Sequence, residues 1–319
     1  MNPTLQNACD LFVHNKNCLQ ATVSTNSIYM HLGAANCLST LNIAADAQSL
    51  LNCKKYLKNN SAFLSAFRDK SQVVLIAKMS QYTNPDAYFT TVQSFYSYIN
   101  SSRKWFGSNC QMLSSAILAD FAGNIAPEQL LSETDALYSA IKQQHKIITN
   151  DEDWPFIAVL AASNIGPDIL LQDTVETYPL LQQRFSGDVQ SLSHALAVCQ
   201  MPAVEKCSRF CEIFYALKSA KCGVSEALYR AALAPLVLIQ APTAEIVNTI
   251  AEIDDYLKHQ KGFGFFSGIS ANTRHVFAAQ IAINVYGCNS TLMNDIVLCS
   301  MLQLQLERDR QDAAACSST

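Results

Sequence analysis

Residues 110–143 read CQMLSSAILADFAGNIAPEQLLSETDALYSAIKQ, and the architecture follows from this stretch. A first segment of small and aliphatic residues leads into a turn that contains proline. A longer segment follows, in which apolar residues recur at spacings of three, four and seven. This spacing places an apolar stripe along one side of a helix. The stretch therefore predicts a helical hairpin, with a buried first helix and an amphipathic second helix.

The same order of segments recurs along the chain with a period of about forty residues. The second helix of each unit carries a tyrosine, and these tyrosines are Tyr96, Tyr138, Tyr178, Tyr215 and Tyr256. A period in this range is the sequence signature of stacked helical hairpins, and we expect the tyrosines to pack between them. The sequence predicts an all-α fold, a helical-hairpin repeat array of the HEAT/armadillo-like α-solenoid type.

Patterns typical of strands are sparse, and the chain is expected to form one continuous domain. Residues 233–240 contain Pro235, and we interpret them as a buried helix with a kink near its start. Residues 1–70 are predicted to be N-terminal capping helices and residues 71–268 the hairpin repeats. Residues 269–319 are predicted to be a closing hairpin followed by a frayed tail. No linker rich in Gly, Ser or Pro divides these parts.

The composition indicates a folded protein with few charges. Hydrophobic residues make up 50% of the 319 residues and charged residues only 15%, so there is ample apolar surface to bury. The net charge is −4 and the basic residues are scattered. We expect no nucleic-acid partner, because neutralising phosphates requires a basic stripe. We also expect no membrane partner, since the longest uncharged run, residues 231–244, is too short to span a bilayer.

The twelve cysteines do not suggest a disulfide framework. Most of them occupy apolar helical positions, where cysteine behaves as a small buried hydrophobe. Cys207 and Cys211 lie one helical turn apart, but no CxxC motif or suitably spaced histidine accompanies them. We interpret the chain as a cytoplasmic protein with reduced thiols, and we predict no cofactor.

Two segments carry acidic residues directly before a short apolar helix, TNDEDWPFIAVLAAS at 149–163 and FSGDVQSLSHALAVC at 185–199. Their candidate catalytic or metal-binding residues are Asp151, Asp153, Asp188 and His194. Because the segments begin successive repeats, these side chains can approach one another. Carboxylates beside an imidazole suit hard cations or acid–base chemistry. The structural alternative is that Asp153 or Asp188 caps a helix and that His194 is hydrogen-bonded within the stack.

The same two segments resemble a family of uncharacterised bacterial proteins, the domain of unknown function 4003 family. The family's Leu-Ser-His phrase is matched by residues 192–194, and its Leu-Thr-x-x-Asp-Asp-like phrase, with one extra acidic residue, by residues 148–153. The similarity extends over nearly the whole chain and is weakest in its opening third. The resemblance implies a bacterial, all-helical cytoplasmic protein whose activity is unassigned.

No sequence motif points to a specific activity. The glycine-containing run 262–268 lacks the Lys-Ser/Thr of a phosphate loop, and no GxSxG or HExxH motif occurs. A repeat array offers an extended concave surface. We therefore predict a binding or scaffolding protein that holds a peptide or protein partner in the groove of the middle repeats, about residues 110–220. The alternative is a metal-dependent or acid/base enzyme that uses the Asp/His cluster.

Overall fold

The computed structural model describes the chain except for residues 63–64, 103–108, 145–150, 188, 265–267 and 318–319. Every regular element in this described part is a helix, so the all-α prediction is confirmed. In chain order the helices are α1 (Pro3–Thr22), α2 (Ile28–Thr40), α3 (Ala47–Asn59), η1 (Ala66–Arg68), α4 (Gln72–Met79), α5 (Pro85–Ser102), α6 (Asn109–Phe121), α7 (Pro127–Gln144), η2 (Asp151–Asp153), α8 (Trp154–Ala162), α9 (Pro167–Gln182), α10 (Gln190–Ala197), α11 (Ala203–Ser219), η3 (Ala227–Tyr229), η4 (Ala231–Leu238), α12 (Thr243–Lys258), α13 (Ala271–Val285) and α14 (Thr291–Ser317).

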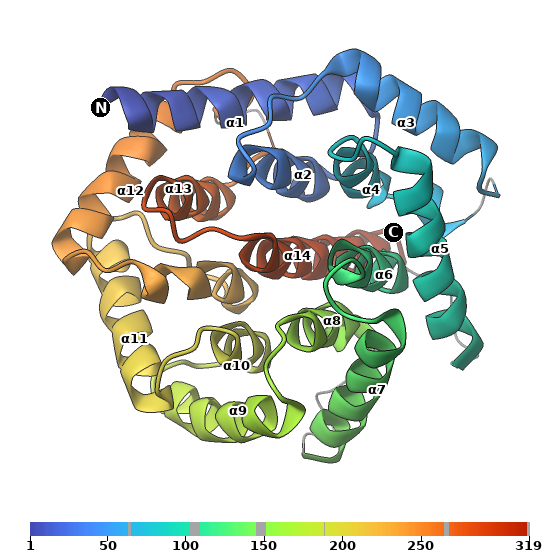
Figure 1. Cartoon of the computed structure of the whole chain (residues 1–319). Coiled ribbons are helices and arrows are strands. Elements are labelled where there is room, and N and C mark those ends of the chain that lie inside the picture. The colour runs from blue at the N-terminus through green and yellow to red at the C-terminus, as the bar shows by residue number, and fades with distance from the viewer. Residues whose placement is uncertain (63–64, 103–108, 145–150, 188, 265–267, 318–319) are drawn as a thin grey trace.

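The helices form a ring with two layers (Figure 1). The outer helices run along the rim, and they are α1, α3, α5, α7, α9, α11 and α12. The inner helices lie inside the rim and are seen nearly end-on in this view, and they are α2, α4, α6, α8, α10 and α13. An outer helix packs mainly against the inner helix that follows it, as α5 does on α6 and α7 on α8. The packed pair is therefore not the predicted hairpin, because the proline-containing turn sends the outer helix away from the inner helix before it.

The two layers follow from the two kinds of helix in the sequence. All nine residues of α8 are buried, as are residues 110–119 of α6. In the outer helix α7, only one side is buried, with Leu130, Leu137 and Ile141 at most 1% exposed, while Glu133 on the other side is charged. Helices that are buried on all sides therefore occupy the inner layer, and amphipathic helices cover them.

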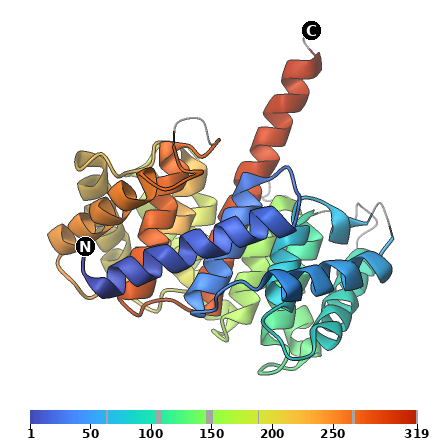
Figure 2. The same ribbon diagram turned by 90° about the horizontal axis from the view of Figure 1, so that it is seen from above.

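The C-terminal helix α14 lies inside the ring, and its last turns project from one face (Figures 1 and 2). Residues 293–305 of α14 are buried, and the helix contacts α2, α6, α8 and η4. The approach to α2 is close, because a Cβ on Gly33 would lie 2.7 Å from Cδ2 of Leu298. The inner surface that we predicted to be an open groove is thus covered by the chain's own C-terminal helix.

The first and last thirds of the chain meet and close the ring. Helix α1 packs against α12 and α13. At this contact the buried Lys16 donates a hydrogen bond of 3.2 Å to the carbonyl oxygen of Lys261 and lies 4.7 Å from the ring centre of Phe263. The N-terminal helices therefore join the C-terminal part instead of capping a free end. An open α-solenoid is not established, and the described helices form a closed ring around α14.

Several local predictions can be compared with the structure. Residues 231–238, which include Pro235, form the 3-10 helix η4. The tail AAACSST at 313–319, which we predicted to fray, is helical as far as Ser317. Tyr138 is 3% exposed and stacks on Trp154 at 4.8 Å, as expected of a packing residue, but Tyr215 is 44% exposed. Among the described helices, none combines the length and apolar character needed to cross a membrane.

Candidate functional site

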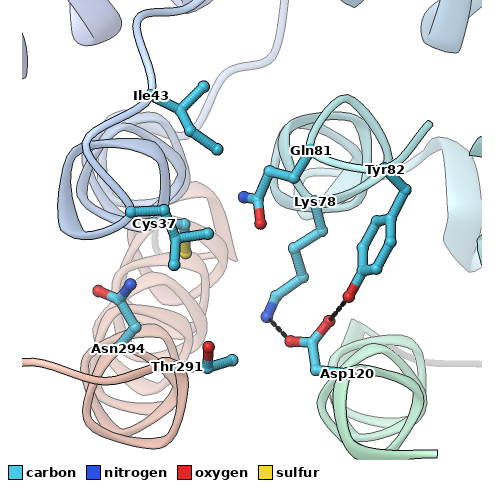
Figure 3. A pocket seen from close by; sticks show the side chains of 9 residues that line it. Cys37, Ile43, Lys78, Gln81, Tyr82, Asp120, Thr291 and Asn294 are labelled. Carbon is cyan, nitrogen blue, oxygen red and sulfur yellow. Dashed lines mark hydrogen bonds and ion pairs between the residues drawn. The ribbon is translucent and has the colours of Figure 1, made fainter. Parts of the chain in front are cut away.

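A pocket of about 380 Å³ lies where α2, α4 and α6 end and α14 begins (Figure 3). Its volume falls at the lower end of the range of small-molecule sites. The residues that line it are Cys37, Leu41, Ile43, Lys78, Gln81, Tyr82, Asp120, Thr291 and Asn294. Four separate elements supply these side chains, so the pocket exists only in the closed ring with α14 in place.

Lys78 is the centre of a buried charged cluster beside this pocket. Its ammonium donates to the carboxylate of Asp120 in α6 and, at 2.8 Å, to the carboxylate of Asp295 in α14. The three side chains are at most 5% exposed. Buried charges are tolerated when they are paired and hydrogen-bonded. The cluster thus joins two inner helices to the central helix and places ionised groups against a pocket.

The position of Lys78 explains why a cation is stable there. It lies in the last turn of α4, and a helix C-terminus attracts positive charge. Burial lowers the pKa of Lys78, but the charges of Asp120 and Asp295 outweigh this effect and hold the pKa well above its ordinary value. Burial raises the pKa of Asp295 to about 7, against the attraction of Lys78. Asp295 is therefore the carboxyl group of the cluster whose protonation is favoured by burial.

Two stacked tyrosines hold Asp120 in place. The hydroxyl of Tyr88 donates to Oδ1 of Asp120 at 2.7 Å, and that of Tyr82 donates to the same oxygen at 3.4 Å. The two rings stack with their centres 4.4 Å apart. Burial raises the pKa of both hydroxyls, so they act as hydrogen-bond donors and not as acids. Tyr82 is 40% exposed and forms a wall of the pocket.

The pocket contains polar atoms whose hydrogen-bonding capacity is unused within the described residues. The amide nitrogen of Gln81 is buried and has no acceptor there, and Figure 3 shows this amide beside the pocket. Oδ1 of Asn294 accepts from Asn36 at 2.5 Å and from Thr40 at 3.1 Å, which fixes the orientation of its amide. Buried polar atoms without partners are rare in folded proteins. Their presence beside a pocket marks it as a candidate binding site.

Of the four candidate site residues predicted from the sequence, the structure describes the side chains of two, Asp153 and His194. Asp153 occupies the N-cap position of α8 but makes no capping hydrogen bond with its side chain. His194 is buried in α10, with its ring 6.4 Å from that of Phe156 in α8. The side chain of Asp151 and the whole of Asp188 lie outside the described residues. The predicted Asp/His cluster therefore stays a prediction.

Two further observations concern metal binding in that region. The neighbouring Glu152 forms an ion pair with Arg310 near the end of α14, so one acidic side chain of the predicted segment holds the C-terminal helix. In the part of the chain that the structure describes, no three His, Cys, Asp or Glu side chains are grouped so that they could hold a metal ion.

Sequence analysis missed the Lys78 cluster because its members are far apart in the chain. Lys78 and Asp120 are separated by 42 residues, and Lys78 and Asp295 by 217. A usable signal was nevertheless present. Each residue is the single charge of a largely apolar stretch, as in VVLIAKM, SSAILADF and NDIVLCS. Charged residues are almost never fully buried unless they are paired, so isolated charges in apolar helices predict partners in one another.

A second pocket, of about 400 Å³, lies on the outer layer between α9 and α11. It falls within residues 110–220, where we predicted the working surface, and Val204 and Tyr215 on its lining are 69% and 44% exposed. Its Cys207 thiol has a pKa raised to about 12 by burial, which makes it unreactive. The buried ion pair between α9 and α11, Lys206 with Asp173, does not contribute to the lining of this pocket, so the pocket is the weaker candidate.

The fold and the site define an all-helical ring with a charged cluster between its inner layer and its central helix. The chain belongs to the family described as protein of unknown function (DUF4003), whose model matches residues 15–307. The resemblance seen in the sequence is thus confirmed. No curated protein and no solved structure matches the chain. Since the family has no assigned activity, function has to be argued from the site.

Proposed function

We propose that this protein binds a small polar molecule in the pocket beside Lys78. The observation that carries the proposal is the buried amide nitrogen of Gln81, which lacks an acceptor among the described residues and borders the pocket. A buried donor without an acceptor costs about 1–3 kcal/mol. A ligand that accepts a hydrogen bond from Gln81 recovers this free energy on binding.

The rigidity of the pocket also supports binding. Lys78 is held by two carboxylates, and Asp120 is held by Lys78 and two tyrosine hydroxyls. Side chains that are already fixed lose little conformational freedom when a ligand arrives, so more of the interaction free energy appears as affinity. The proposal requires no metal or cofactor.

This proposal moves the binding site away from the groove predicted from the sequence. A peptide along the inner layer would have to displace α14, whose residues 293–305 are buried there. A protein or peptide partner therefore has no support at that surface. The outer pocket between α9 and α11 lies within residues 110–220, and a peptide or protein partner in this region stays a prediction.

Acid–base catalysis on the bound molecule is the second candidate function. The specific observation in its favour is Asp295, whose pKa of about 7 suits proton exchange at neutral pH. Its carboxylate is fully buried, so a proton would have to reach the pocket through Lys78, which contacts it. Turnover that is lost in Asp295→Asn, while ligand binding persists, would support catalysis over binding alone.

The binding proposal can be tested by native mass spectrometry and thermal shift on protein exposed to a small-molecule extract of its host. We expect the wild type to retain a small molecule and Gln81→Leu to lose it. The matched control is Gln172→Leu, since Gln172 is exposed on α9 and its amide donates to Glu176 in the adjacent turn. If the wild type retains nothing and no extract fraction raises its melting temperature, the proposal is wrong.

A further inference from the structure

We infer that the ligand of this pocket is a small, uncharged carbonyl compound whose oxygen accepts hydrogen bonds from Lys78, Gln81 and Asn294. The inference rests on the proposed binding function and adds the chemical class of the ligand. It follows from an account of which hydrogen-bonding groups around the pocket are already used.

The groups left over in the pocket are donors. The Lys78 ammonium has three N–H bonds and uses two of them on Asp120 and Asp295. Gln81 has a buried amide nitrogen without an acceptor among the described residues. Asn294 is 6% exposed, and its amide oxygen accepts from Asn36 and Thr40, so its amide nitrogen is the group that it can offer to a ligand. Figure 3 shows these three side chains around one space.

The carboxylate oxygens of Asp120, in contrast, already accept hydrogen bonds. Oδ2 of Asp120 accepts from Lys78, and Oδ1 accepts from Tyr82 and Tyr88. Oδ2 of Asp295 has no donor among the described residues, but Asp295 is fully buried and does not line the pocket. A ligand N–H therefore meets no carboxylate oxygen of the cluster that both lines the pocket and lacks a donor, whereas a ligand oxygen meets the donors of Lys78, Gln81 and Asn294.

The charge balance of the cluster excludes ionic ligands. Lys78 is already paired with Asp120 and Asp295, so an anion would gain little from its ammonium and would bring a negative group close to the Asp120 carboxylate. A cation would meet the ammonium of Lys78 and would compete with it for Asp120. An uncharged ligand oxygen avoids both of these unfavourable interactions. The predicted ligand is therefore a carboxamide or a ketone, and not a carboxylate, a phosphate or an amine.

The rest of the ligand is predicted to be apolar. Leu41 and Ile43 form part of the lining beyond the polar groups, and Cys37 lies beside them. Burial raises the pKa of the Cys37 thiol to about 12, so Cys37 presents a neutral, weakly polar surface. A carbonyl group attached to a short hydrocarbon portion matches this division into a polar and an apolar side.

The test compares two sets of matched probes by protein-observed NMR titration. One set is isobutyramide, isobutyrate and isobutylamine, and the other is benzamide, benzoate and benzylamine. Within at least one set we expect the amide to bind at least about ten-fold more tightly than its acid or its amine. Gln81→Leu and Gln81→Glu should both weaken the amide at least about ten-fold, while Gln172→Leu, with an intact pocket, should not.

The possible failures of this inference and of the binding proposal are distinguishable. Equal or tighter binding of an acid or an amine in both sets would overturn the inference, and so would the absence of any amide binding up to millimolar concentration. If the wild type binds a molecule from the host extract and Gln81→Leu does not, the binding proposal remains valid even though the inference about the ligand is wrong. If nothing in the extract binds either, both are wrong.

Discussion

The Lys78 ammonium lies 2.8 Å from the carboxylate of Asp295, and this contact fastens the central helix α14 to the inner layer of the ring. Because both side chains are buried, the contact is more than a surface ion pair. It fixes the start of α14 at the place where the pocket opens. The same cluster therefore serves the fold and the proposed ligand site.

Replacing Lys78 with methionine should destabilise the protein strongly. The change leaves Asp120 and Asp295 buried without their cation, and breaking a buried pair in this way costs about 3–5 kcal/mol. Urea denaturation followed by circular dichroism measures the loss. The matched control is Lys70→Met, whose pair with Asp309 is about one-third exposed and should contribute less than about 1 kcal/mol. Equal losses in the two variants would contradict the importance of the buried cluster.

The stability of the protein should fall as the pH rises from about 4 to about 7. Folding raises the pKa of Asp295 from its ordinary value of 3.8 to about 7, chiefly by burial. Within that window the folded protein keeps a proton that the unfolded chain has lost. The contribution of Asp295 is therefore greatest at low pH and declines as the pH approaches 7, by at most about 1.4 kcal/mol per pH unit.

Asp295→Asn should remove this component of the pH dependence, as measured by unfolding at a series of pH values. Asp312→Asn, at an exposed position of the same helix, serves as the control and should keep the wild-type slope. An unchanged slope in Asp295→Asn would show that Asp295 is ionised throughout the window.

Gly33→Ala should destabilise the contact between α2 and α14. The new Cβ would lie 2.7 Å from Cδ2 of Leu298, which is fully buried. Overpacking of this kind costs about 1–3 kcal/mol, and the better helix propensity of alanine offsets only about 1 kcal/mol. In a double-mutant cycle with Leu298→Ala, the double variant should lose less free energy of unfolding than the two single variants lose together. Gly123→Ala, with no atom within 4 Å of its Cβ, should be tolerated.

Much of the layer structure was predictable from local sequence. The fully apolar run of α8 predicts a helix that is buried on all sides, and the one-sided apolar pattern of α7 predicts a helix with one face in solvent. Pro167 after Gly166 correctly marks the start of α9. These signals depend on neighbours within one or two turns, and for that reason a single sequence contains them.

The closure of the ring and the place of α14 were not predictable in the same way. The contact of Lys16 with Lys261, and that of Gly33 with Leu298, join residues more than two hundred positions apart. Nothing in the period of the helices states whether an array stays open or closes. The pocket depends on this closure, so its Lys78 cluster could be expected only from the isolated charges in apolar helices.

The cysteines should differ sharply in reactivity. Burial raises the pKa of the Cys9, Cys37 and Cys199 thiols to about 12, so at pH 8 almost none of each is present as the reactive thiolate. Cys316 is exposed near the end of α14. Mass spectrometry after brief alkylation of the native protein should find Cys316 modified first, and Cys316→Ser should lack this fast reaction.

In denaturant without reductant, all twelve cysteines should react, as expected for a protein with reduced thiols. A lower count in protein kept from air would reveal disulfides, and early labelling of Cys37 would mean that the pocket opens more widely than this structure shows.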